Sequence, residues 1–142
     1  GQTGQQPAAA GRIAALWQAV GAQVHRMDAV EHDAVFAAVS HLPHLLAFAY
    51  VGQIREHPDA QTFLDFAASG FRDFTRIASS HPAVWRDIAL ANRGFLQQLA
   101  AAQRAQLERL ETMLQNGDAD GLYRYFAAAK QTRDEWLDKQ DG

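Results

Sequence analysis

Apolar residues recur every three or four positions along most of this chain, and the pattern stops at a few glycine and proline residues. Positions three, four and seven apart lie on one face of an α-helix, so this spacing predicts helices that each bury one side. The sequence has no internal repeat and no strand-rich region. It therefore predicts an all-α fold of about five or six helices, over residues 11–20, 29–55, 58–69, 71–80, 82–115 and 122–137.

The residues between these segments are typical of helix ends. Asp and Ser accept hydrogen bonds at an N-cap, proline suits the first helical position, and glycine commonly follows the last turn. Such residues stand where the pattern breaks: Asp28, then Ser80, His81 and Pro82, then Asn116 and Gly117, then Asp118 or Asp120. Pro43 is a different kind of break, because it removes a backbone hydrogen bond inside an apolar helix, and we expect a bend or restart there.

The first 28 residues differ from the rest of the chain. Residues 1–10 have no apolar period and predict a flexible leader, and residues 22–27 (AQVHRM) fit either a strand or a loop. Between them, the apolar stripe of residues 11–20 predicts a helix that Gly21 ends. We therefore expect residues 29–142 to form the all-α domain, and residues 1–28 to precede it as a separate piece.

Two adjacent apolar stripes run along the long central helix predicted over residues 82–115. One contains Val84, Ile88, Phe95, Leu99, Ala102, Leu110 and Met113, and the other contains Trp85, Ala89, Leu96, Ala100, Leu107 and Leu114. A second stripe left in water would expose more apolar surface than monomers usually tolerate. We therefore expect a homodimer in which two copies cover this surface. The alternative is that residues 122–137 fold back and cover it within one chain.

Ionisable residues interrupt the apolar segment EHDAVFAAVSHLPHLLAFAY at residues 31–50. His41 and His44 are three positions apart and share a helical face, with Pro43 between them. Two interpretations remain open on spacing. The imidazoles line a site, or they are hydrogen-bonded to neighbouring carbonyls in a kinked core helix.

A second group of charged residues follows Gly70. Arg72, Asp73 and Arg76 are three or four positions apart, so they share a helical face. Charge spacing by itself favours a solvated ion pair between Asp73 and Arg76, which contributes little to stability when exposed.

Composition narrows the function classes. The net charge of −3 includes no basic stripe, which argues against nucleic-acid binding. Cysteine is absent, so disulfides and thiolate metal sites are excluded. No apolar run approaches the roughly 20 residues that cross a bilayer, and no signal peptide is recognisable. We therefore expect a cytoplasmic protein without a membrane segment.

A metal site is the weaker catalytic alternative, because the ligands must come from several segments. All-α phosphohydrolases that use His-Asp pairs are the enzymes this alternative describes. The available ligands are His32, Asp33, His41 and His44 and, from other segments, His25 and Asp73. We expect no bound metal. Glycine-rich phosphate loops and nucleophile elbows are also missing from the sequence.

Several motifs together resemble the C-terminal domain of prephenate dehydrogenases, including the arogenate-using members of that family. They are HD at 32–33, SHLPH at 40–44, GFRDFTRIA at 70–78 and P-x-x-W-x-D-I followed by N at 82–92. The order and spacing are those of the family, and the resemblance covers residues 11–137. It implies an enzyme that oxidatively decarboxylates prephenate to 4-hydroxyphenylpyruvate in tyrosine biosynthesis.

The resemblance implies a two-domain enzyme, in which a Rossmann domain binds NAD or NADP and a helical domain dimerises and closes the substrate site. Residues 11–27 would correspond to the last helix and strand of that Rossmann domain, the rest of which this chain does not contain. The resemblance therefore implies no catalytic and no cofactor-binding residue here. We expect the isolated chain to be inactive.

Individual roles also follow from the resemblance. Arg76 matches the family's substrate-binding arginine, whose guanidinium suits a carboxylate. The substrate-binding residues that it implies are His41, His44, Asp73, Arg76 and Trp85. Asp73 would orient Arg76 or a histidine, and Trp85 would form an aromatic wall in the site of its own chain or of the partner subunit. The competing hypothesis is an independent helical interaction module that kept the fold and lost the reaction.

Overall fold

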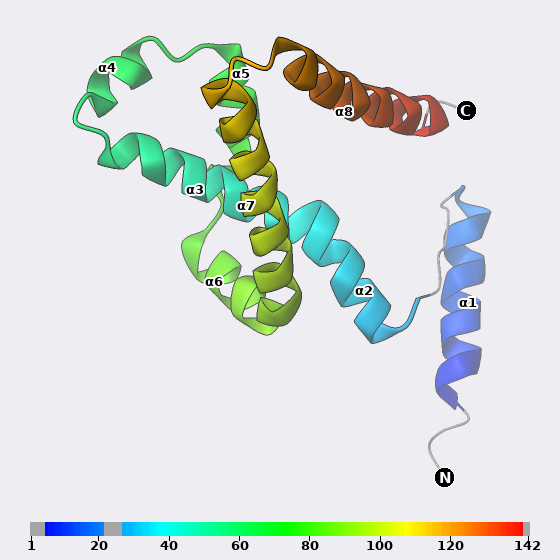
Figure 1. Ribbon diagram of the computed structural model, residues 1–142. Coiled ribbons are helices and arrows are strands. Elements are labelled where there is room, and N and C mark those ends of the chain that lie inside the picture. Colours follow the sequence, from blue (N-terminus) through cyan, green and yellow to red (C-terminus); the bar gives the residue numbers. More distant parts are fainter. Residues whose placement is uncertain (1–4, 22–26, 141–142) are drawn as a thin grey trace. The chain divides into compact units, whose positions relative to one another are not determined.

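The structure is a computed structural model that describes residues 5–21 and 27–140 (Figure 1). Every regular element in these ranges is helical, which confirms the predicted all-α class. The described chain contains eight α-helices, more than the expected five or six because some predicted helices are divided. It splits into two units, residues 1–35 and 36–142, and each is described by itself.

In the first unit, α1 spans Gln5–Ala19 and Gly21 follows it with a φ of 84°. The helix starts inside the segment predicted to be a flexible leader, where alanines at positions 8–10 favour helix. α2 spans Ala29–Phe36, and Asp28 caps it as predicted, since its Oδ1 accepts from the Glu31 N–H at 2.8 Å. The predicted strand or loop at 22–27 falls almost entirely outside the described residues.

The second unit is organised around α3, which packs against α4, α5, η2 and α7. Its elements are η1 (Ala37–His41), α3 (Leu42–Glu56), α4 (Ala60–Asp65), α5 (Ser69–Thr75), η2 (Arg76–Ser79), α6 (Pro82–Ala91), α7 (Arg93–Gln115) and α8 (Ala119–Gln140). The short elements α4, α5 and η2 lie where the sequence predicted two helical segments.

The break expected at Pro43 takes the form of a π-helical turn, η1, directly before the proline. Proline has no N–H, so the normal helix ladder cannot continue through it. The chain instead uses a wider turn, in which the Leu42 N–H donates to the Ala37 carbonyl five residues back. The helix then resumes as α3 and ends at Glu56, one residue beyond the predicted end.

One predicted helix is divided. The sequence predicted continuous helix over residues 82–115, but Asn92 has φ −110° and ψ 26° and separates α6 from α7. Both backbone groups of Asn92 keep their bonds to the residues four positions away, Ile88 and Leu96, while its buried side chain is bonded to His41. Helix propensity within a long apolar pattern could not indicate this tertiary contact. The start of α6 agrees with prediction, since His81 accepts from the Ala83 N–H.

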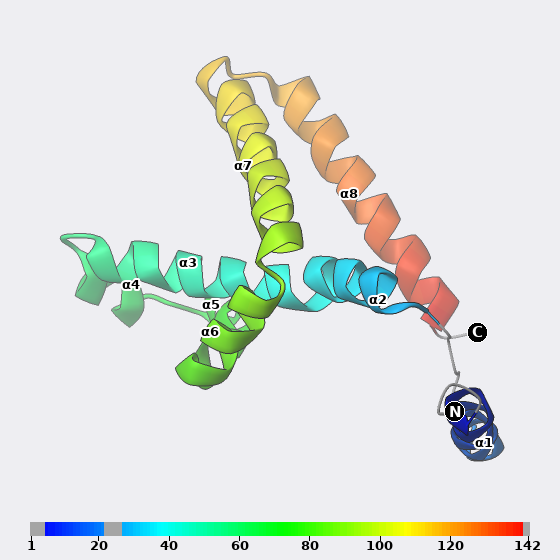
Figure 2. The ribbon, with the colours of Figure 1, turned by 90° about the horizontal axis from the view of Figure 1, so that it is seen from below.

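α7 and α8 are joined by the turn that the sequence predicted. Gly117 has a φ of 60°, a left-handed conformation that glycine adopts without strain, and the Asp118 N–H returns to the Met113 carbonyl at 2.9 Å. Asp118 then caps α8 by accepting from the Gly121 N–H at 2.8 Å. Beyond this turn the two helices diverge (Figure 2).

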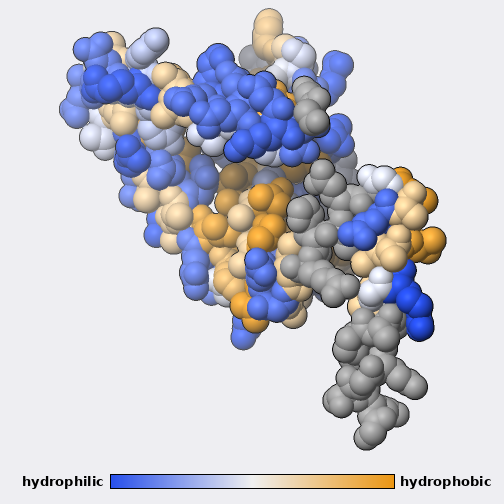
Figure 3. Space-filling view, turned by 90° about the vertical axis from the view of Figure 1, so that its right-hand side faces the viewer, coloured by the Kyte–Doolittle hydropathy of each residue, from blue (hydrophilic) through white to orange (hydrophobic). Residues whose placement is uncertain are grey.

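The second unit buries few large side chains. Among the described residues only Ala37, Ala47 and Leu96 are buried apolar side chains, and two of these are alanines. Many large apolar side chains of α6, α7 and α8 face solvent instead: Val84, Leu90, Leu107, Leu114, Tyr123, Phe126, Trp136 and Leu137. Hydrophobic side chains are accordingly visible on the molecular surface (Figure 3).

The segment from Ala29 to Glu56 is a continuous helix that is long and apolar enough to cross a membrane by length and composition. The sequence analysis missed this because it counted uninterrupted apolar runs, whereas a few histidines and a glycine lower mean hydropathy only slightly. Core helices of soluble proteins pass the same test. In the described chain α3 contacts η1, α4, α5, η2 and α7, and 11% of the apolar window is buried.

Candidate functional site

Three of the five predicted site residues lie together in the second unit. His41 ends η1, His44 lies in the first turn of α3, and Trp85 lies in α6. The His44 and Trp85 rings are stacked, with centroids 3.5 Å apart and an angle of 16° between their planes. The His41 ring meets the same indole edge-on, at 6.1 Å and 78°. We call these three residues and Asn92, which bonds to His41, the histidine cluster.

Nδ1 of each histidine in the histidine cluster is hydrogen-bonded within the chain. Nδ1 of His44 lies 2.9 Å from the Ser40 carbonyl oxygen, which is the carbonyl bond expected of a kinked core helix. Nδ1 of His41 lies 3.3 Å from Nδ2 of Asn92, whose residue is 8% exposed. The sequence left two interpretations of these histidines open. The structure shows the hydrogen-bonded rings of the second interpretation, half-buried against the Trp85 indole, and the site-lining interpretation stays a prediction.

Arg76 lines a separate pocket of about 490 Å³ at the junction of α5 and η2. A second guanidinium, that of Arg72, lines the same pocket. The remaining lining residues are Ala67, Ala68, Phe71, Thr75 and Ser79. Both arginines are exposed, so their charges remain hydrated and available to an anion. Between described residues, neither a hydrogen bond nor a ring contact joins Arg76 to the histidine cluster.

Asp73 is exposed on α5. The solvated Asp73–Arg76 ion pair that charge spacing favoured is not formed among the described residues. Its absence has a geometric reason, because α5 ends at Thr75 and Arg76 begins a 3₁₀ turn, which changes the side-chain directions that regular α-helical spacing assumes.

Potential metal ligands are dispersed in the described part of the chain, where no three histidine or carboxylate side chains gather. His32 and Asp33 contact each other at 3.3 Å on the surface of the first unit. His25, which the phosphohydrolase alternative required, lies outside the described residues.

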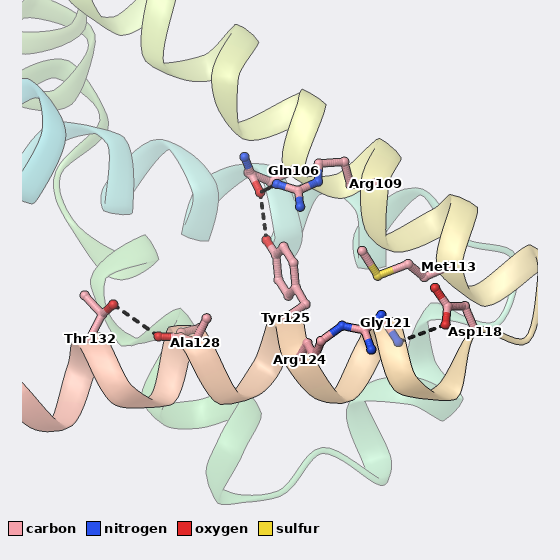
Figure 4. Close-up of a pocket in the computed structure, with 10 residues that line it drawn as sticks. Gln106, Arg109, Met113, Asp118, Gly121, Arg124, Tyr125, Ala128 and Thr132 are labelled. Atoms are coloured by element: carbon pink, nitrogen blue, oxygen red, sulfur yellow. Dashed lines mark hydrogen bonds between the residues drawn. The ribbon is translucent and has the colours of Figure 1, made fainter.

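Another pocket of the second unit, about 580 Å³, lies between α7 and α8 (Figure 4). The Tyr125 side chain extends from α8 toward α7, where its hydroxyl donates to Gln106 Oε1 at 3.1 Å. Arg109 also donates to that oxygen and lies 5.5 Å from the centroid of the Tyr125 ring. The pocket therefore has a polar, partly cationic lining. None of the predicted site residues belongs to it.

Comparison with known proteins identifies the family of this chain. Residues 28–128 match the family described as "Prephenate dehydrogenase, dimerization domain", which is more than half of the chain. The chain belongs to the prephenate dehydrogenase family. The match covers η1, α3 and the histidine cluster, and it extends into α8.

Curated relatives agree with this assignment. The chain is 38% identical over 120 residues to a prephenate dehydrogenase of Bacillus subtilis, covering 84% of this chain and 32% of the relative. It is 34% identical over 123 residues to a cyclohexadienyl dehydrogenase of Zymomonas mobilis, covering 85% and 42%. The chain thus spans about a third to two fifths of the length of these two dehydrogenases.

Solved structures show the same fold. A prephenate dehydrogenase from Aquifex aeolicus, in complex with hydroxyphenyl propionate and NAD+, superimposes with a TM-score of 0.80 at 34% identity, over 89% of this chain and 44% of that one. A Synechocystis arogenate dehydrogenase superimposes with a TM-score of 0.82 over 92% and 48%, and at 23% identity this likeness concerns the fold alone.

Two residues of this prephenate dehydrogenase domain lie at the candidate site but were not predicted as site residues from the sequence. Arg72 lines the pocket of Arg76, and Asn92 bonds to His41. Arg72 had been noted only as one member of a charged face, although its spacing of four from Arg76 was a usable signal. Asn92 had been noted only as part of a motif. A polar residue inside a long apolar helical pattern is a signal for a buried hydrogen bond.

Proposed function

We propose that this chain is the C-terminal part of a cytoplasmic prephenate dehydrogenase, which oxidatively decarboxylates prephenate to 4-hydroxyphenylpyruvate with NAD or NADP. In this proposal the chain supplies substrate-binding residues and the dimer interface. The observation that carries it is the meeting of His41, His44 and Trp85, which come from two segments distant in sequence. A helical interaction module has no need to gather two imidazoles against one indole.

The histidine cluster suits a small ring substrate with polar groups. The Trp85 indole provides a flat apolar surface, and the imidazoles provide hydrogen-bonding groups beside it. Sites for small molecules generally combine such an apolar wall with a few well-placed polar groups. Prephenate, with its ring, hydroxyl and carboxylates, has the matching chemistry.

The arginine pocket supplies the cations that the reaction requires. Prephenate carries two carboxylates, and a guanidinium binds a carboxylate through two parallel hydrogen bonds. We assign Arg76 to one carboxylate, and the shared pocket makes Arg72 a candidate for the same anionic substrate. Asp73 remains a candidate for orienting a nearby cation when substrate is bound, since it follows Arg72 directly in α5.

The nicotinamide cofactor acts as the hydride acceptor in such a reaction. This chain's residues do not fit a dinucleotide site, because no glycine-rich strand-to-helix turn exists in its sequence. The Aquifex aeolicus relative was solved with NAD+, and the chain covers 44% of that protein. We therefore assign cofactor binding and the catalytic base to parts of the enzyme beyond this chain.

Dimerisation is assigned to α6, α7 and α8. Their large apolar side chains are exposed in one chain, and the matched family is described as a dimerization domain. The alternative considered from sequence was that α8 covers the second stripe of the long helix. α8 instead diverges from α7, and Phe126 and Trp136 remain 56% and 52% exposed. A second copy covers these surfaces, with an expected total buried area of roughly 2,000 Å² or more.

The direct test measures reduction of NAD+ and NADP+ by the complete gene product that contains this chain, with prephenate and with arogenate as substrates. We expect reduction with one or both substrates, and none with the 142-residue chain alone. A folded, dimeric full-length protein that oxidises neither substrate would support the interaction-module hypothesis instead.

A further inference from the structure

Arg72 and Arg76 place two guanidinium groups in one pocket. Arg72 lies in α5 and Arg76 begins η2, and both side chains line the pocket of about 490 Å³. Both arginines are exposed, and neither forms an ion pair with a described carboxylate. Two like charges that share a pocket repel each other, so the pocket favours a ligand with enough negative charge to neutralise both.

The described residues that line this pocket include no acidic side chain. Asp73, which follows Arg72 directly in α5, is not among them. The Thr75 hydroxyl, which does line the pocket, donates its proton to the Phe71 carbonyl at 2.6 Å. The pocket therefore offers the donors of two guanidiniums, and none of its described lining residues has a carboxylate that could pair with a cationic group of a ligand.

The two candidate substrates differ in charge at one position. Prephenate has a keto group in its side chain, where arogenate has an ammonium group, and both molecules carry two carboxylates. Prephenate is thus a dianion, whereas the ammonium group leaves arogenate with a single net negative charge. A keto oxygen accepts a hydrogen bond from a guanidinium. An ammonium group can only donate, and it carries the same charge as the arginines.

We propose that Arg72 is a specificity-determining residue that selects prephenate over arogenate. Arg76 binds one carboxylate, as assigned above, and Arg72 binds the keto-acid side chain, whose adjacent carbonyl and carboxylate oxygens match the fork of guanidinium donors. Arogenate in the same position brings its ammonium group against Arg72, with no acidic partner among the described lining residues. Specificity then arises from this repulsion as well as from attraction to prephenate. This inference deepens the proposed function and rests on it.

The exposure of Arg72 keeps the expected discrimination moderate. Water and salt screen charges at a protein surface, so like charges there repel each other much less than buried ones do. We expect the complete gene product to have a kcat/KM for prephenate about ten- to a hundredfold above that for arogenate, with the same cofactor. Because the preference is electrostatic, it should shrink as the salt concentration rises from about 0.05 M to about 0.5 M.

Variants at position 72 of the complete enzyme test the assignment. Arg72→Gln keeps a hydrogen-bonding group and removes the charge, so we expect kcat/KM to fall about tenfold for prephenate and much less for arogenate. Arg72→Lys retains the charge and should keep most of the preference for prephenate. Arg55→Gln is the control, because Arg55 is an exposed arginine that pairs with Glu56 outside the pocket, and it should leave both values unchanged.

The possible outcomes separate this inference from the proposed function. An enzyme that prefers arogenate, or an Arg72→Gln variant that loses the same factor with both substrates, would overturn the specificity role and leave the proposed function standing. A complete enzyme that oxidises neither substrate would refute the proposed function, and this inference with it. Circular dichroism should show native helix content in each variant, and if Arg72→Gln does not fold, the preference of the wild type and its salt dependence decide.

Discussion

Around His41, His44 and Trp85 the side chains meet within one chain and Nδ1 of each histidine is hydrogen-bonded, whereas along α7 and α8 large apolar side chains face solvent. The first region needs nothing else to define its geometry. The second exposes surface that a stable monomer would bury. The proposed binding site is thus formed within one chain, whereas the proposed interface requires a second copy.

The comparison teaches which properties depend on a second copy. Ring stacking and the Asn92 amide are internal contacts, so the geometry of the histidine cluster should persist when the dimer is weakened. α7 and α8 contact each other from the turn at Gly117 to the Tyr125–Gln106 hydrogen bond and diverge beyond it, so we expect a second copy to cover their exposed apolar side chains. Changes in the two regions should therefore affect different measurements.

The largest effect is expected from charging the exposed apolar face of α8. Phe126→Glu places a carboxylate where an aromatic side chain, 56% exposed in one chain, is expected to enter the interface. Aromatic residues at the centre of an interface commonly contribute 2–4 kcal/mol, so we expect the dimer dissociation constant to rise about 30- to 1,000-fold. Sedimentation velocity over a concentration series measures this directly.

Ala127→Glu is the matched control, since it adds the same charge one position along α8, on the face that carries the Lys130–Asp134 ion pair. It should leave the mass near twice 15.7 kDa at micromolar concentration. Equal dissociation by both variants would mean that added charge, rather than the Phe126 surface, weakens the dimer. A wild-type mass of 15.7 kDa would remove the dimer argument altogether.

Arg76→Ala in the complete enzyme should raise the KM for prephenate by about ten- to several-hundred-fold, which corresponds to the roughly 1.5–3 kcal/mol of a charged hydrogen bond. The KM for the cofactor should hardly change, because Arg76 lies in the α5–η2 pocket of this domain. Arg55→Ala is the control, since Arg55 is an exposed arginine paired with Glu56 at the end of α3. An unchanged KM for prephenate would exclude Arg76 from the site.

Much of the fold could be predicted because helix ends depend on local chemistry. Asp28, His81 and Gly117 each bond or turn within a few residues of their own positions, and all three act at the helix ends that the sequence indicated. The break at Asn92 could not be predicted in this way. Its hydrogen bond joins residues 51 positions apart, which no helical period contains.

In the candidate site, too, local contacts could be predicted from the sequence, and contacts between distant segments could not. The stacking of His44 on Trp85 requires that α6 fold back against the start of α3, whereas Arg72 and Arg76 line one pocket from positions only four apart. Spacing placed the two histidines on one face, but the indole they meet came only from the family resemblance. The Asp73–Arg76 ion pair fails for a local reason, because the chain changes from α to 3₁₀ geometry between them.

Replacing the indole tests whether the histidine cluster is complete in one chain. Trp85→Leu removes the stack on His44, and we expect the free energy of unfolding to fall by about 1–2 kcal/mol, while Trp85→Phe loses less because it retains a ring. Urea unfolding at one fixed protein concentration measures this without a change in mass action. Trp17→Leu, at an exposed position of α1, is the control and should change little.

The smallest effect concerns the turn that starts α8. Asp118→Ala removes the cap on the Gly121 N–H and should lower the free energy of unfolding by about 1 kcal/mol.

Gly121→Ala should also destabilise, for a different reason: the added Cβ would overlap the Asp118 carboxylate and displace the cap. Once Asp118 is alanine the obstruction is gone, and alanine then favours helix over glycine by up to about 1 kcal/mol. Gly121→Ala should therefore change sign, from destabilising in the wild type to stabilising in the Asp118→Ala background. Urea unfolding of the four proteins at one concentration completes this double-mutant cycle. Additive losses would show that the cap and the glycine act independently and would contradict the predicted change of sign.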